Sequence, residues 1–162
     1  MNYYHLNNHI ERELSNPEEI KSIFRHGKYA TIAMCRSNEP YVVTLSYGYD
    51  AARQCLYFHA ANKGLKLDFL KSNPDVCGTI IEDGGYIHGE CGHNYKSLVF
   101  RGEMKVVEDM NEMKHGMEVL LRHLEKDPNV ITEKLMKSES FYTAKMVMLR
   151  LDLKHVSGKA GR

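Results

Sequence analysis

The sequence predicts a single α+β domain, spanning residues 1–162, built around a barrel of five or six antiparallel strands. Three β-prone runs, at 29–34, 40–49 and 54–60, follow one another with only short polar turns between them. Parallel strands need long crossover connections, so this spacing favours an antiparallel meander. Helical patterns lie before, among and after the β-prone runs, which is typical of the α+β class.

Local signals set the ends of the predicted helices. Asn16 can cap the first helix, Pro17 suits its first position, and Gly27 ends it. A second helix spans about 64–71 and is closed by Pro74, because proline cannot continue a helix. The other predicted elements are a strand at 76–81, a Gly-rich loop at 83–94, a strand at 98–108, a helix at about 109–125, a short helix at 132–137, a strand at 146–153 and a loose tail from about 157.

Composition restricts the function classes. A formal net charge of +1 gives no electrostatic basis for binding nucleic acid or an anionic membrane. No apolar run approaches the ~20 residues that a spanning helix needs, and residues 1–5 lack a signal-peptide pattern. We therefore expect a cytoplasmic protein. The cysteines show no CxxC pair, and free thiols are expected there.

Residues 56–68 hold the most informative local pattern. An apolar run ends at His59, and a short loop with Lys63 and Gly64 then opens a helical pattern that carries Lys66. Unpaired N–H groups at a helix start attract anions, and two lysines add full charges. This pattern indicates a phosphate site at a strand-to-helix turn. The alternative is an ordinary turn with two solvated lysines, because short Gly/Lys loops are weak motifs.

Other sites are less supported by the sequence. No GxGxxG fingerprint, Walker A loop, HExxH motif or Ser-His-Asp order occurs. His88, Cys91 and His93 form a cluster of zinc-type ligands in a Gly-rich loop, but no fourth ligand is apparent. We therefore predict a flexible loop near the mouth of a site with no metal bound, and a zinc site is the alternative.

Five motifs, in this order, resemble a known family. They are Gly27–Ala30, Pro40–Tyr49, Leu56–Ala60 with Gly64–Lys66, Asn73–Cys77 and Tyr95–Gly102. Together they resemble the flavin-binding split-barrel family related to pyridoxamine 5'-phosphate oxidase. Within it they look most like the 5-nitroimidazole-resistance branch, over roughly residues 10–158.

The resemblance implies a six-stranded antiparallel split barrel, with flanking helices, that forms a homodimer with flavin at the subunit interface. FMN is the expected cofactor, and FAD is possible. The residues that the resemblance assigns to the cofactor are Thr44, Leu45, His59, Ala60, Lys63, Lys66, Tyr95 and Ser97. Tyr95 and Ser97 would face the flavin of the neighbouring subunit. His59 is the candidate catalytic residue; the alternative is a strand-end histidine satisfied by backbone.

The resemblance also implies an oxidoreductase that takes a hydride from NAD(P)H and reduces a small organic acceptor such as a nitroaromatic compound. The chain departs from pyridoxamine 5'-phosphate oxidase itself, because it has no tryptophan and residues 150–158 lack that enzyme's substrate-binding pattern. Vitamin B6 phosphates are therefore not the expected substrate. The alternative is a flavin- or haem-binding module without turnover, with His88 or His93 as a haem ligand. A barrel without any cofactor is a third reading.

Overall fold

The computed structural model describes residues 10–129 and 146–161, which contain three α-helices, a short 3-10 helix and seven strands. The helices are η1 (Ile10–Arg12), α1 (Pro17–His26), α2 (Leu65–Ser72) and α3 (Met110–Leu124). The strands are β1 (Tyr29–Arg36), β2 (Glu39–Ser46), β3 (Gly48–Asp50), β4 (Cys55–Ala61), β5 (Asp75–Ile87), β6 (Gly92–Val106) and β7 (Met146–Gly161). No helix in these ranges is both long and apolar enough to cross a membrane.

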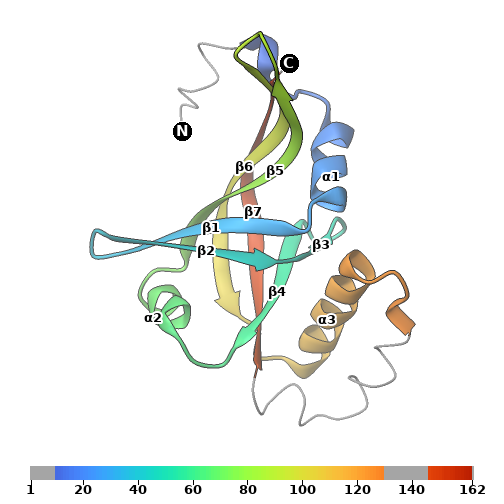
Figure 1. The fold of residues 1–162 in the computed structure, drawn as a ribbon. Coiled ribbons are helices and arrows are strands. Elements are labelled where there is room, and N and C mark those ends of the chain that lie inside the picture. The colour runs from blue at the N-terminus through green and yellow to red at the C-terminus, as the bar shows by residue number, and fades with distance from the viewer. Residues whose placement is uncertain (1–9, 130–145, 162) are drawn as a thin grey trace.

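The strands form one antiparallel sheet in the order β2-β1-β5-β6-β7-β4-β3. β1 and β2 run crosswise to β5, β6 and β7, so the sheet wraps around a core (Figure 1). β2 contacts β4 without pairing to it, which leaves the barrel split between these strands. The α+β class and the split-barrel architecture predicted from the sequence are confirmed.

The sheet has seven strands instead of the predicted six, because the run at 40–49 divides in two. Tyr47 turns inward at the division, is fully buried, and donates a hydrogen bond from its hydroxyl to the backbone oxygen of Phe24 at 2.8 Å. β2 then pairs with β1, whereas β3 pairs with β4. The predicted meander is therefore wrong at this point: β2 and β4 are not hydrogen-bonded neighbours.

Two segments predicted as irregular are strands. The predicted loop at 83–94 is the far part of a long β5–β6 hairpin, where a register shift between Asp83 and Gly85 lets the ladder continue. The predicted tail from 157 is the last part of β7, which pairs with β6 as far as Gly161. The backbone N–H of Leu14 also donates to Gly158 O at 3.0 Å. Ladder hydrogen bonds, which local composition does not reveal, order both segments. The predicted helix at 132–137 lies outside the described residues.

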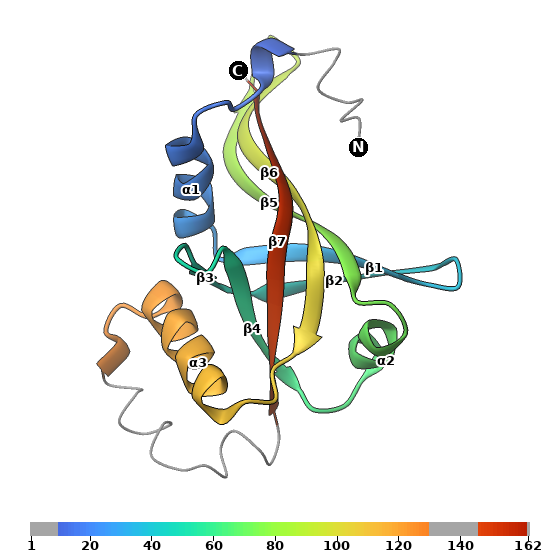
Figure 2. The ribbon, with the colours of Figure 1, turned by 180° about the vertical axis from the view of Figure 1, so that it is seen from behind.

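The helices close the barrel on different sides. α2 lies at one end of the barrel, and α1 and α3 lie on the other side (Figures 1 and 2). α2 buries Leu67, Phe69 and Leu70 in the main core, and the ring of Tyr41 on β2 lies 5.1 Å from the ring of Phe69. This contact links β2 to the helix that follows β4.

A polar cluster holds α3 against β4 and β7. The buried Tyr57 donates a hydrogen bond to Glu112 Oε1 at 3.0 Å, and Arg150 Nη1 lies 2.6 Å from the same oxygen. The Arg150 guanidinium holds the pKa of Glu112 below its ordinary value of 4.5. Because this carboxylate is shielded and hydrogen-bonded, its negative charge stabilises the folded state.

We expect Glu112→Gln to lower the free energy of unfolding at pH 7 by about 1–3 kcal/mol, because it removes the charged partner of Arg150. The folded-state pKa of Glu112 is depressed, so its contribution is present above pH 4.5 and is lost as pH falls through the folded pKa. The difference between wild type and variant should therefore shrink below pH 4.5. Urea unfolding at fixed protein concentration measures both.

Glu118→Gln is the matched control, since Glu118 lies on the same helix and its nearest guanidinium, that of Arg122, is exposed and 3.8 Å away. It should change the free energy of unfolding by less than about 0.5 kcal/mol. An equal loss in both variants would contradict the assignment of this role to Glu112.

Candidate functional site

The β4–α2 turn is the core of the candidate site. β4 ends at Ala61, and α2 begins at Leu65 after Gly64, whose φ of +135° suits glycine. No side chain caps the helix, so amide N–H groups of its first turn lack a side-chain acceptor. A side chain at Gly64 would meet no atom within 4 Å, so the turn opens to solvent.

Two lysines stand at this turn, and no acidic side chain in the described part of the chain pairs with them. Lys63 is exposed, and Lys66 is half-buried in the first turn of α2. Within residues 10–129 and 146–161, neither ammonium group makes an ion pair or a side-chain hydrogen bond. Within these ranges, two cations without a counter-charge stand beside first-turn amide groups that no side chain caps, and such a surface attracts an anion.

The four residues predicted to contact the flavin ring do not all point the same way, because successive side chains of a strand face opposite sides of the sheet. Thr44 and His59 point outward and are exposed, whereas Leu45 and Ala60 are half-buried and buried and belong to the core. The Thr44 hydroxyl lies 3.0 Å from that of Thr31 on β1. A ligand on the outer surface would therefore meet the side chains of Thr44 and His59 but only the backbone of Leu45 and Ala60.

Neighbouring elements carry these residues. β2 carries Thr44, β4 carries His59, and the turn after β4 carries the two lysines, while β2 contacts both β4 and α2. One side of the split barrel thus combines outward polar groups with a cationic turn. Such a combination can hold a planar cofactor that has a phosphate tail.

Tyr95 and Ser97 do not join this group within one protomer. They lie on β6, which β1 and β5 separate from β2 in the sheet. Tyr95 pairs with Asp83 and Gly161, and Ser97 pairs with Ile81 and Lys159. Both side chains are half-buried.

The predicted cluster of His88, Cys91 and His93 lies at the tip of the β5–β6 hairpin, where both histidine rings contact the ring of Tyr86. The Tyr86 ring lies 5.4 Å from the ring of His88 and 6.1 Å from that of His93. His93 Nε2 lies 2.8 Å from Asp83 Oδ1, and the Gly85 N–H and His93 together hold the pKa of Asp83 below its usual range. In the described part of the chain, no group of three or more His, Cys, Asp and Glu side chains could hold a metal ion.

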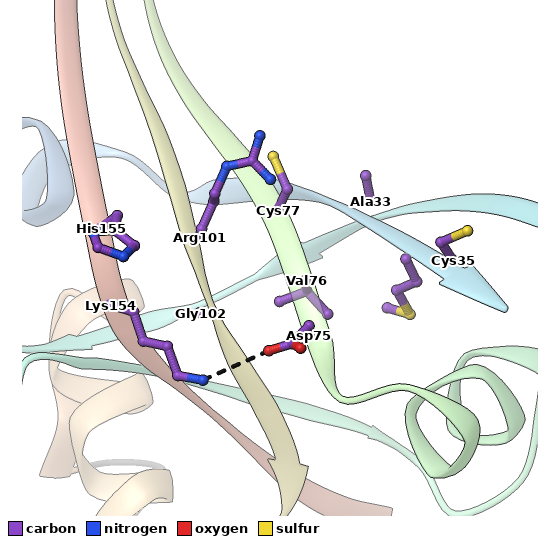
Figure 3. A pocket seen from close by; sticks show the side chains of 10 residues that line it. Ala33, Cys35, Asp75, Val76, Cys77, Arg101, Gly102, Lys154 and His155 are labelled. Carbon is purple, nitrogen blue, oxygen red and sulfur yellow. Dashed lines mark ion pairs between the residues drawn. The ribbon is translucent and has the colours of Figure 1, made fainter. Parts of the chain in front are cut away.

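Three surface hollows, of about 450, 840 and 430 Å³, are lined by residues other than those of the β4–α2 turn. Among the predicted site residues, only Tyr95 lines one of them. The first hollow contains Arg101 and Cys77, which the sequence did not assign to any site (Figure 3). The one available signal was a charged side chain between Phe100 and Gly102 in a strand-like run.

Comparison with known proteins agrees with the fold. A family model described as pyridoxamine 5'-phosphate oxidase matches residues 16–160. An uncharacterised protein from Rhizobium meliloti (strain 1021) is 30% identical over 112 residues, which cover 69% of this chain and 68% of that protein.

Solved structures show the same architecture. A protein from Bacteroides thetaiotaomicron VPI-5482, put forward as a 5-nitroimidazole antibiotic resistance protein, is 24% identical with a TM-score of 0.76, over 92% of this chain and 86% of that one. An FAD-binding protein from Mesorhizobium loti is also 24% identical, with a TM-score of 0.66, over 92% and 96% of the two chains. At this identity the likeness establishes the fold alone.

Proposed function

This chain belongs to the pyridoxamine 5'-phosphate oxidase family, and on that premise we propose that it is a flavin-dependent oxidoreductase. The observation that carries the proposal is a pair of lysines, without an ion-pair partner among residues 10–129 and 146–161, at the uncapped start of α2 and next to strands that present Thr44 and His59 outward. The similarity to an FAD-binding protein supports a flavin. FMN is the proposed flavin, and FAD would use the same ring and first phosphate site.

Each residue has a defined part in this proposal. Lys66 and the first amide groups of α2 bind the flavin phosphate, and Lys63 adds charge at the rim. Thr44 and His59 border the ring, and the His59 imidazole is placed to donate a hydrogen bond or a proton to a bound acceptor. The flavin itself supplies hydride acceptance and electron transfer, so no acid–base pair is required of the protein.

A second copy of the chain completes the proposed site. The outward face of the sheet beside Thr44 is small or apolar over several strands, and its members are Tyr29, Thr31, Ala33, Val42, Thr79, Ile81 and Val99. Tyr29, Val42 and Ile81 are 64%, 58% and 61% exposed, an arrangement typical of a protein–protein contact. A homodimer through this face would bring Tyr95 and Ser97 of one copy toward the flavin of the other.

The proposed reaction takes a hydride from NADH or NADPH and reduces a small organic acceptor such as a nitroaromatic compound. The similarity to the Bacteroides protein supports this acceptor class. The cytoplasm, where NAD(P)H is available, is the proposed location. The deciding experiment follows the flavin absorbance of the loaded protein under anaerobic NADH or NADPH. Bleaching that a nitroaromatic compound reverses supports the enzyme. Bound flavin that stays oxidised supports a binding module, and a Soret band would indicate haem.

We expect Lys66→Ala to weaken FMN binding by about 1–3 kcal/mol, roughly 5- to 150-fold in Kd, because it removes a cation from the phosphate. Riboflavin lacks the phosphate, so its Kd should barely change. Quenching of flavin fluorescence on titration measures both ligands.

Lys71→Ala is the matched control, because Lys71 is exposed in the last turn of the same helix. It should leave the Kd for FMN within about twofold, since the effect of a charge at a helix terminus falls off within one turn. An unchanged FMN affinity in Lys66→Ala, or an equal loss for riboflavin, would exclude Lys66 as the phosphate ligand.

We expect Val42→Lys to shift the protein from dimer to monomer and to release flavin, because an ammonium group would be buried in the proposed contact. Sedimentation velocity and the retained flavin absorbance measure the two effects. Ala52→Lys, at an exposed turn position, adds the same charge away from this face and should change neither. A monomeric variant that keeps its flavin would contradict the proposal of a shared site.

A further inference from the structure

A pocket opens where β1 leaves β5. The two strands pair only from Thr31 to Ala33, opposite Cys77 to Thr79, and then diverge toward the β1–β2 turn and α2. The resulting wedge is a pocket of about 450 Å³. Its apolar lining comes from the exposed Ala33 and from the edges of Met34 and Val76, which belong to the core and are only 3% and 5% exposed. Its other members are Cys35, Cys77, Asp75, Arg101, Gly102, Lys154 and His155.

One guanidinium group in this pocket, that of Arg101, lacks a counter-charge among the residues that the structure describes. Arg101 stands between Cys77 on β5 and His155 on β7 in the strand register, and Figure 3 shows its guanidinium group beside the Cys77 sulfur. Within residues 10–129 and 146–161, Arg101 makes no ion pair and no side-chain hydrogen bond. The protein therefore leaves its donors available to a ligand.

The other charges of the pocket are already used. Lys154 Nζ lies 3.6 Å from Asp75 Oδ1 and 3.2 Å from Glu103 Oε2. Figure 3 shows Lys154 turned toward Asp75, away from the Arg101 guanidinium group. His155 makes no ion pair and no side-chain hydrogen bond with the described residues. The uncompensated charge of the pocket is thus positive and centred on Arg101.

A β-bulge shapes this side of the pocket. Arg101 pairs with His155 but Gly102 pairs with Leu153, so Lys154 is an extra residue in β7. Bulges redirect side chains and are frequent beside binding sites. Here the bulge allows the two consecutive residues Lys154 and His155 to line the same pocket as Arg101.

We propose that this pocket binds the carboxylate of a small organic acid, with Arg101 as the principal ligand and His155 beside it. The planar fork of a single guanidinium group matches a carboxylate, and the apolar walls fit a hydrocarbon or aryl body. The pocket adjoins the face proposed above as the contact between copies and shares Ala33 with it, because Ala33 and Cys77 are one alternate position along from Thr31 and Thr79. If the proposed function holds, the acid is a candidate acceptor, but the binding site does not depend on flavin.

Benzoate and benzyl alcohol test the proposal, since they share an aryl body and differ in charge. We expect the wild-type protein, without added flavin, to bind benzoate at least tenfold more tightly than benzyl alcohol by isothermal titration or ligand-observed NMR. Arg101→Gln should raise the benzoate Kd at least tenfold, and Arg101→Lys by less. Lys159→Gln removes one positive charge from the same face outside the pocket, and should leave the Kd within about threefold.

Thiol protection gives a second readout. Benzoate should slow the alkylation of Cys77 by iodoacetamide in wild type but not in Arg101→Gln, while Cys91 on the distant hairpin turn reacts at the same rate throughout. Equal affinity for the two probes, an unchanged Kd in Arg101→Gln, or an equal loss in Lys159→Gln would overturn the proposal. A change in oligomeric state of Arg101→Gln would assign Arg101 to a contact between copies, and would also overturn it.

Discussion

The short pairing between β1 and β5 is the constraint on which the rest of the structure depends. It joins the β1–β2 hairpin to the other five strands, and it centres on Gly78, opposite Ile32. A Cβ atom at Gly78 would lie 2.5 Å from the Phe100 ring and 2.9 Å from Ile32 Cδ1, both of which belong to fully buried side chains. Glycine therefore permits the close crossing at which the sheet changes direction.

Both candidate sites follow from this crossing. On one side it carries β2 across to β4 and α2, so that Thr44 lies on a strand that contacts the elements bearing His59 and Lys66. On the other side it opens the wedge that contains Arg101. In the first site two lysines that have no counter-charge in the described part of the chain lie near outward polar groups. In the second, Arg101, also without a counter-charge there, lies beside an apolar lining. Both arrangements favour anionic ligands with a substantial apolar part.

The sequence predicted the fold class and most elements because alternation, capping residues and turns are local signals. It did not predict the division at Tyr47, which depends on burial of that ring beneath α1 and on its bond to Phe24. It also predicted irregular structure for the hairpin at 83–94 and for the segment after 157, although hydrogen bonds to neighbouring strands order both in the structure. Such partners are distant in sequence, so local composition does not reveal them.

The candidate site was also predictable only in part. The cationic β4–α2 turn was predictable because all its residues are consecutive, whereas the outward or inward direction of Thr44 and Leu45 required the register of β2. The distance of Tyr95 and Ser97 from this turn required the strand order. The Arg101 pocket depends on a bulge in β7 and on the divergence of β1 from β5, neither of which has a local sequence signal.

The absorbance spectrum of the purified protein, mixed with FMN and then desalted, tests the central claim most directly. The account predicts a retained two-banded flavin spectrum, with one flavin for each chain. A colourless protein would contradict it, because the lysines and amide groups at the start of α2 would then hold no flavin phosphate.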